Sequence, residues 1–527
     1  MTRSLVRTLA ALAALAAPAG AQTRAAPPPA ERPTLVVLLT VDQLIPAYFD
    51  RYGSQLTGGL GRLQRGGAYF TRAYQDHANT ETAPGHASTL SGRFPRSTGI
   101  VQNVAGVQDP QAPLLGGGGT GASPFRFRGS TLMDWLRLRD PRSRGLSVSR
   151  KDRGAILPLG RSNQQVYWYA GDGRFTTSTW YADTLPAWVQ RFNARRIPQG
   201  MAGRAWTLLL PESAYPEPDS VPVESGGRNF TFPHRLPADP EQAARSLPEF
   251  PWMDQVTLDL ALEGMRELRL GAGPQTDVLA VSLSTTDAVG HRYGPDSREI
   301  HDQVLRLDRM LGAFLDSLYA RVDSSRVVVA LTSDHGVTSF PEVRPGGAAA
   351  ARYHVYLDSV VARTRRQVAA AGVDSAAVRF EDALLWVDRA AFRGARLSPD
   401  SVARAFAAAA RRVPGVQRVD LVRTLARDTA TSFIARRWHH MLPPDLPVEV
   451  AVTLHPGHVF GRATYAQHGA PHDHDAHVPL IFYGPHFRPG RYTRFARVVD
   501  LAPTLARVLG VTPTERLDGR VLEEALR

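Results

Sequence analysis

The chain contains four runs in which apolar, mostly β-branched residues follow one another without polar interruption. They cover residues 34–42 (TLVVLLTVD), 277–287 (DVLAVSLSTTD), 326–335 (RVVVALTSDH) and 477–484 (HVPLIFYG). Continuous valine, leucine and isoleucine runs bounded by polar residues are typical of strands that are buried on both faces, as in a parallel sheet covered by helices. We therefore predict four core strands.

Between these runs the pattern changes to a helical period. In residues 298–322 the apolar stripe formed by Val304, Leu307, Leu311, Phe314 and Leu318 recurs at spacings of three and four, which predicts an amphipathic helix. Residues 498–511 (VVDLAPTLARVLGV) predict another. Strands alternating with helices indicate an α/β fold, a doubly wound and mostly parallel sheet with helices on both faces.

Two long regions interrupt this alternation. Residues of about 155–250 are rich in Trp, Tyr, Pro and Gly and predict an irregular insert. Residues of about 351–455 contain an alanine- and arginine-rich helical stretch and the strand-like VEVAVTLH, which indicates a small α/β subdomain. We expect one folded domain over 34–527 with these two inserts. The glycine run at 116–121 lacks the Lys-Ser/Thr of a P-loop and predicts a loop.

The N-terminus has the pattern of an export signal. Arg3 and Arg7 precede the apolar run 8–20 (TLAALAALAAPAG), and Ala19-Gly20-Ala21 fits a signal-peptidase site. We predict a signal peptide over 1–21, cut after Ala21, and a linker over 22–33; a retained anchor is the alternative. The mature protein is then periplasmic or secreted, with no membrane association. Without cysteine, it has no disulfide and no thiolate chemistry.

The formal net charge of +13 favours anionic partners. The arginines are spread along the chain, and there is no basic tail, zinc finger or RNA-binding signature. Nucleic acid is therefore not expected as a specific partner, and small anions are.

Acidic and histidine side chains follow three of the predicted strands. Asp42, Asp287 and Asp334 stand at strand ends, where ligand sites lie in such sheets. A buried carboxylate is costly unless it is paired or binds a metal. One aspartate could cap a helix, but three with nearby histidines favour a metal centre, and this mixed set of oxygen and nitrogen donors suits Zn²⁺. The histidine candidates are His291, His335, His468, His472, His474 and His477.

A candidate nucleophile lies in residues 79–92 (NTETAPGHASTLSG). Thr82 precedes a segment in which Pro84 fits a first helical turn, so its hydroxyl would face the positive end of a helix. Free backbone N–H groups there favour a bound phosphate. The alternative is that Thr82 only caps the helix, and Thr80 and Ser88 are competing hydroxyls.

Several segments together resemble a known family. TVDQ (40–43), TETAPGHAS (80–88), GIVQN (99–103), KDRGAILP (151–158), STTDAVGH (284–291), TSDHG (332–336) and HDAHVPLIFYG (474–484) follow the order found in the alkaline phosphatase superfamily. More narrowly, the chain is similar to the one-threonine, two-zinc bacterial alkaline phosphatases, which are related to the nucleotide pyrophosphatase/phosphodiesterases. The resemblance covers nearly all of the predicted mature chain.

The resemblance implies a zinc-dependent phosphate monoester hydrolase that acts through a phosphothreonine on Thr82. It implies one zinc held by Asp42, Asp334 and His335, a second held by Asp287, His291 and His477, and Thr82 as a metal-bound nucleophile. It further implies that Asn103, Lys151 and Arg153 bind the phosphoryl group of small-molecule monoesters. His472 and His474 depart from the family pattern. The resemblance does not specify an oligomeric state.

Lys151 is the only lysine in the chain. A compact ammonium and the forked guanidinium of Arg153 can hold two phosphoryl oxygens at once, and arginine cannot replace the ammonium without changing its size and direction. We interpret Lys151 as retained for function.

Four alternatives differ in chemistry. A phosphodiesterase on the same scaffold would carry a pocket for the second ester group in place of the Lys-x-Arg pair. A sulfatase or a cofactor-independent phosphoglycerate mutase is disfavoured, because neither uses a threonine at the position of Thr82. A non-catalytic zinc-binding protein would hold metal without turnover.

Overall fold

The computed structural model describes residues 31–527 except 117–118, 344–346 and 463–464. The predicted signal peptide and most of the predicted linker lie outside the described residues. Within them, no helix has both the length and the apolar composition needed to cross a bilayer.

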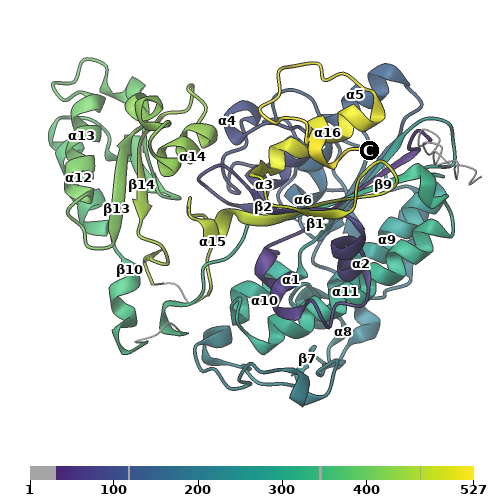
Figure 1. The fold of residues 1–527 in the computed structure, drawn as a ribbon. Coiled ribbons are helices and arrows are strands. Elements are labelled where there is room, and N and C mark those ends of the chain that lie inside the picture. The colour runs from purple at the N-terminus through teal and green to yellow at the C-terminus, as the bar shows by residue number, and fades with distance from the viewer. Residues whose placement is uncertain (1–30, 117–118, 344–346, 463–464) are drawn as a thin grey trace, which may run out of the picture.

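A ten-stranded sheet forms the centre of the molecule, in the order β17-β2-β16-β9-β1-β8-β3-β4-β5 with β18 beside β2 (Figure 1). Its strands are β1 (Leu35–Val41), β2 (Ala68–Tyr74), β3 (Gly145–Ser149), β4 (Gln165–Tyr169), β5 (Phe175–Thr176), β8 (Asp277–Leu283), β9 (Val327–Thr332), β16 (His477–Tyr483), β17 (Gly490–Tyr492) and β18 (Ala496–Arg497). Strands β9, β1, β8, β3 and β4 are parallel, so their carboxyl ends lie along one edge. All four predicted strands are present, but β16 runs antiparallel to both of its neighbours.

Successive residues of β1 enter different cores, as the alternation of side chains along a strand requires. Leu35, Val37 and Leu39 pack in one hydrophobic cluster, whereas Val36 and Leu38 pack in another. Since both faces are covered, every residue of β1 is buried. The predicted doubly wound α/β architecture is confirmed.

Helices cover both faces of the sheet (Figure 1). The first face carries α1 (Pro46–Tyr52), α2 (Gly59–Gly66), α9 (Trp252–Glu267), α10 (Thr285–Tyr293) and α11 (Arg298–Tyr319). The second carries α3 (Thr82–Thr89), α5 (Leu132–Arg139), α6 (Asp152–Ile156) and α16 (Leu501–Leu509). The short helices α4 (Pro95–Thr98) and α15 (Asp473–Ala476) lie in the connections near the site. The predicted stripe of α11 is fully buried, at 0–1% exposure.

The region expected as the first insert is partly core. Strands β4 and β5 extend the main sheet, and α6 lies against β3 and β4. The irregular part that follows contains α7 (Ala187–Ala194), α8 (Pro240–Ser246) and the pair β6 (Ala205–Trp206) and β7 (His234–Arg235). Its aromatic residues, including Trp188, Trp206 and Tyr215, join the first core cluster. This region therefore thickens the core instead of forming a separate unit.

The second region forms a sheet of its own. Its antiparallel strands are ordered β11-β12-β14-β13, with bounds Val378–Glu381, Leu384–Val387, Val448–Leu454 and Val416–Leu421. Helices α12 (Asp358–Ala370) and α13 (Pro399–Ala410) pack on one face in a separate hydrophobic cluster. On the other side, α14 (Phe433–Met441) joins a smaller cluster that includes Ala78 and Val101 of the main body. A short parallel pair, β10 (His354–Val355) and β15 (Val459–Phe460), lies close to where the chain enters and leaves the second insert.

Candidate metal centre and nucleophile

Carboxylates from three parallel strands meet at one edge of the main sheet. Asp42 follows β1, Asp287 lies in the first turn of α10 after β8, and Asp334 follows β9. All three side chains are buried, Asp42 and Asp334 completely. Two groups have potential ligand atoms within 4.8 Å of one another, namely Asp42, Asp334 and His335, and Asp287, His335 and His468. The predicted convergence of the strand-end aspartates is thus present.

Three histidines at this edge share one hydrogen-bonding pattern. The Nδ1 atoms of His291, His335 and His468 lie 2.6, 2.9 and 2.8 Å from the carbonyl oxygens of Ala466, Gly336 and Thr80. A carbonyl only accepts, so each Nδ1 carries a proton and donates it. In a neutral ring each Nε2 then keeps its lone pair, and Nε2 is the atom nearest the carboxylates, 3.2 Å from Asp287 Oδ1 for His291 and 3.9 Å for His468. This arrangement orients histidines as metal ligands.

The electrostatics of the group favour a cation. Burial alone would lower the pKa of His335, but Asp334, Asp42 and Asp287 raise it to about 10. Burial and Asp287 raise the pKa of Asp42, yet Lys151 and His335 outweigh them and hold it well below its usual value. Several carboxylates in a site of low dielectric create this demand for positive charge. The donor set of buried aspartate oxygens and imidazole nitrogens therefore fits a divalent metal such as Zn²⁺.

The structure places His477 outside this group. It is the first residue of β16, and its ring is turned toward β2, where it stacks on Tyr74 with ring centroids 4.8 Å apart and Nε2 lies 2.8 Å from Thr71 O. His468 lies at the site instead, stacked on His335 at 3.6 Å. His472 bonds to Leu454 O, and His474 Nε2 lies 3.7 Å from Asp475, so neither joins the group.

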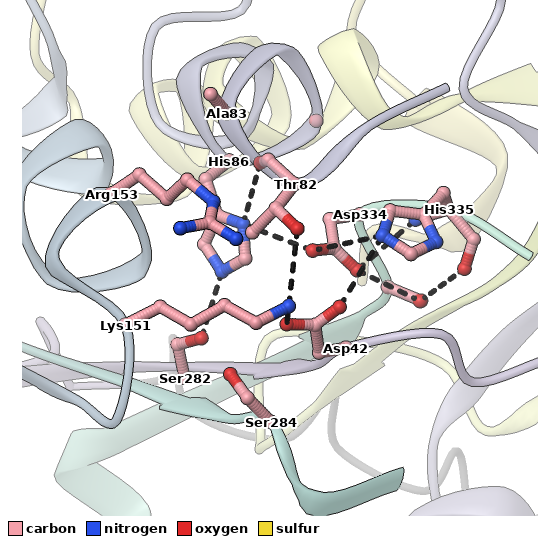
Figure 2. A network of polar contacts seen from close by, with 12 residues as sticks. Asp42, Thr82, Ala83, His86, Lys151, Arg153, Ser282, Ser284, Asp334 and His335 are labelled. Carbon is pink, nitrogen blue, oxygen red and sulfur yellow. Dashed lines mark hydrogen bonds and ion pairs between the residues drawn. The ribbon is translucent and has the colours of Figure 1, made fainter. Parts of the chain in front are cut away.

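Thr82 is the first residue of α3 and is buried, with 1% exposure. Glu81 occupies the capping position, so Thr82 does not act as the cap. Its Oγ1 accepts a hydrogen bond from Lys151 Nζ at 3.2 Å (Figure 2). The competing hydroxyls have other roles, since Thr80 donates to Ala470 O and Ser88 donates to Pro84 O.

Lys151 lies just after β3, at the start of α6, and is 9% exposed. Its ammonium is 2.5 Å from Asp42 Oδ2 and 2.7 Å from Asp287 Oδ2. Arg153 lies in α6, which packs against α3, and Figure 2 draws its side chain together with Lys151, Thr82 and His86. The lysine of the K-x-R segment thus contacts the candidate nucleophile, and the arginine lies on the helix that packs against it.

Asn103 lies next to the start of α3. Its Oδ1 accepts a hydrogen bond from Ala83 N at 2.8 Å, and its backbone N–H donates to Glu81 Oε2 at 2.7 Å. With Oδ1 engaged in this way, the amide nitrogen is the group left to act as a donor.

Several supporting residues were not predicted from sequence. Gln43 donates from its backbone to Asp334 and from its side chain to Asp287, at 3.2 and 2.9 Å. His86 lies between Thr82 O and Ser282 Oγ, with Nδ1 3.2 Å from Asp334 Oδ2. Gln43 lies in TVDQ and His86 lies in TETAPGHAS, two of the segments that carry the family resemblance. Their position in these segments could have identified them as candidate site residues.

The fold and the site together define an α/β enzyme with a candidate divalent-metal centre at the carboxyl edge of its sheet. The chain belongs to the type I phosphodiesterase / nucleotide pyrophosphatase family, whose sequence model matches residues 36–112 and 152–444.

Among individual relatives, the chain is 29% identical to the alkaline phosphatase PhoV of Synechococcus elongatus over 530 residues, which span 94% of this chain and 93% of PhoV. It is 30% identical to the alkaline phosphatase PhoK of a Sphingomonas species over 524 residues, or 93% and 91% of the two chains. The crystal structure of the alkaline phosphatase PafA superposes with a TM-score of 0.85 at 26% identity, covering 94% of this chain and 99% of PafA. PafA comes from Elizabethkingia meningoseptica. The family resemblance inferred from sequence is confirmed.

Proposed function

We propose that this protein is a metal-dependent phosphate monoester hydrolase of the alkaline phosphatase type. The observation that carries the proposal is the position of Lys151. Its ammonium is within hydrogen-bond distance of Thr82 Oγ1 and of the carboxylate of Asp287, a candidate metal ligand. Similarity over nearly the whole chain to PhoV and PhoK supports the same activity.

The proposed cofactor is a pair of Zn²⁺ ions. Asp42, Asp334 and His335 would hold one ion. Asp287, His291 and His468 would hold the other, with His468 in the role that the sequence assigned to His477. When bound, such ions polarise phosphoryl oxygens and lower the pKa of a nearby hydroxyl or water.

The protein's own residues position and stabilise the reacting groups. Thr82 Oγ1 attacks phosphorus, forming an O–P bond as the ester bond to the alcohol breaks, and water then releases orthophosphate from the phosphothreonine. The N-terminal position of Thr82 on α3 places it at the positive end of the helix dipole. Lys151, Arg153 and Asn103 stabilise negative charge on the non-bridging oxygens.

Replacing the hydroxyl tests the proposal. We expect Thr82→Ala with added zinc to lose turnover of nitrophenyl phosphate by several orders of magnitude while it retains bound zinc. Ser88→Ala removes a hydroxyl of the same helix that donates to Pro84 O, and it should keep near wild-type turnover. Zinc binding without turnover in the wild type would favour the non-catalytic alternative.

Phosphodiester hydrolysis is the second candidate, because the matching family is named for it. The Lys151–Thr82 contact favours monoesters, whose additional negative charge an ammonium can neutralise. We expect higher kcat/KM for nitrophenyl phosphate than for bis-nitrophenyl phosphate, and the reverse ranking would favour the diesterase.

Export is part of the proposal and rests on the N-terminal sequence alone. N-terminal sequencing of the mature protein should begin at Gln22, directly after the predicted cut.

A further inference from the structure

A cavity of about 440 Å³ lies between the main body and the sheet of the second insert. Glu81 and His468 line it from the main body, next to the candidate nucleophile and metal centre. Phe380 and Asp382 line it from the β11–β12 hairpin, and Phe460 from β15. The cavity therefore adjoins the site at which phosphorus would react, and its outer wall belongs to the insert.

The charge of this cavity is opposite to that of the whole chain. Glu81, Glu381, Asp382 and Asp475 line it, and among the described residues that line it there is no lysine or arginine. The chain as a whole has a net charge of +13. An acidic cavity in so basic a chain attracts cations and repels anions at short range, where screening by salt is weakest.

Three of these carboxylates already have partners. Asp475 accepts hydrogen bonds from Thr338 Oγ1 and Ala470 N, both at 2.9 Å. Glu381 lies 3.8 Å from Arg379 Nη1. Glu81 accepts a hydrogen bond from Asn103 N at 2.7 Å, and it lines the cavity together with Asp382, which has the same charge. A cationic ligand between them would relieve this repulsion.

Aromatic rings also line the cavity. Phe380 and Phe460 pack edge to face with centroids 5.7 Å apart, and Trp438 also lines the cavity. Ring faces attract alkylammonium groups, and they do so more strongly when the cation is partly desolvated. Aromatic rings beside carboxylates therefore suit an organic cation better than a hydrated metal ion.

We propose that this cavity receives the alcohol part of the phosphate monoester and selects leaving groups that carry an alkylammonium over those that carry a second anion, with Asp382 as the specificity-determining residue. The preferred substrates are then phosphate monoesters of amino alcohols. This inference rests on the proposed monoesterase function, and it adds a role for the second insert in substrate choice.

Three monoesters of similar size test the inference: phosphoethanolamine, glycerol 3-phosphate and 3-phosphoglycerate, whose leaving groups are cationic, neutral and anionic. The measured quantity is the ratio of kcat/KM for phosphoethanolamine to that for 3-phosphoglycerate. Comparing this ratio between variant and wild type cancels the intrinsic reactivity of each ester. We expect Asp382→Asn to lower the ratio about fivefold, as loss of one charge a few ångströms from the ligand predicts, and Asp382→Lys to lower it further.

Asparagine suits the test because Asp382 has a φ of 48°, a left-handed conformation that asparagine tolerates. The matched control is Asp316→Asn, which removes one exposed charge near the end of α11, away from the cavity, and should leave the ratio unchanged. An unchanged ratio in both folded Asp382 variants would overturn the inference while leaving the monoesterase activity intact. Failure of the wild type to hydrolyse any of the three esters would overturn the proposed function instead.

Discussion

The ammonium of Lys151 is within 2.7 Å of carboxylate oxygens on both Asp42 and Asp287 and within 3.2 Å of Thr82 Oγ1. Two carboxylates and one hydroxyl therefore share one compact cation. The guanidinium of arginine is broader and planar, and it cannot occupy this position without displacing one of them. That steric fact explains why a chain with arginine at every other strongly basic position has lysine here.

We expect Lys151→Arg to lower kcat/KM for nitrophenyl phosphate by about 100-fold, the cost typical of losing one donor to a developing charge. Zinc content should stay close to wild type, because no proposed ligand changes. The matched control is Arg142→Lys, a swap in an exposed ion pair with Asp140 that should not alter turnover. Unchanged turnover in Lys151→Arg would contradict the assigned role.

The two histidines His468 and His477 offer a direct comparison of the sequence-based and structure-based assignments. We expect His468→Ala to weaken zinc binding at least tenfold, because its Nε2 faces Asp287. His477→Ala should retain zinc, since that ring stacks on Tyr74. Zinc titration of both variants measures these affinities. Weaker zinc binding in His477→Ala, with normal binding in His468→Ala, would restore His477 as the ligand.

At the scale of the element, core strands and helices could be predicted well, because burial on both faces gives a continuous apolar run and burial on one face of a helix gives an apolar stripe. The runs that form β1, β8 and β9 are buried on both faces, so their sequences had to be continuously apolar. Their carboxyl ends then fixed the location of three aspartates.

The direction of β16 and the side toward which His477 points could not be predicted. An apolar run has the same composition whether its strand is parallel or antiparallel, and the ring of the first strand residue can turn to either neighbour. Here it turns to β2. His468 lies in a loop without periodicity, so only tertiary contacts with Thr80 and His335 identify it.

Helix α3 approaches the strand-end loop so closely that only glycine fits at position 85. A Cβ there would lie 2.3 Å from Asp334 O and 2.7 Å from Asp334 Cβ. We expect Gly85→Ala to push α3, and Thr82 with it, away from Asp334 and to lower kcat at least tenfold, because small displacements of reacting groups are costly.

The control for this change is Gly200→Ala, where an added Cβ meets nothing within 4 Å. It should have the turnover of the wild type. If Gly85→Ala keeps full activity, α3 can shift without disturbing the nucleophile, and the proposed close fit between helix and loop has no catalytic role.

At the scale of the whole molecule, the first insert contributes a buried carboxyl group, that of Glu224. Glu224 is 3% exposed, and burial, Glu299 and Asp219 raise its pKa to about 9. Since the folded state holds this proton more tightly than the unfolded state, the carboxyl reduces stability as the pH rises from about 4.5 to 9. The limiting slope is about 1.4 kcal/mol per pH unit.

Glutamine resembles the protonated acid and does not ionise. We therefore expect the free energy of unfolding of Glu224→Gln, relative to wild type, to increase between pH 5.5 and 8.5 in urea titrations. Glu212→Gln changes an exposed acid in the same region, and its difference from wild type should vary little with pH. A flat difference for Glu224→Gln would show that the acid ionises normally in the folded protein.

The sheet of the second insert has its own hydrophobic cluster, and all the proposed zinc ligands and phosphate-binding residues lie outside it. Mutations in that insert can accumulate without cost to the reaction centre, provided that the unit still folds and docks on Ala78 and Val101. Among natural relatives, substrate choice should therefore change more quickly than the reaction mechanism. The same division would allow the second insert to be exchanged between relatives as one unit.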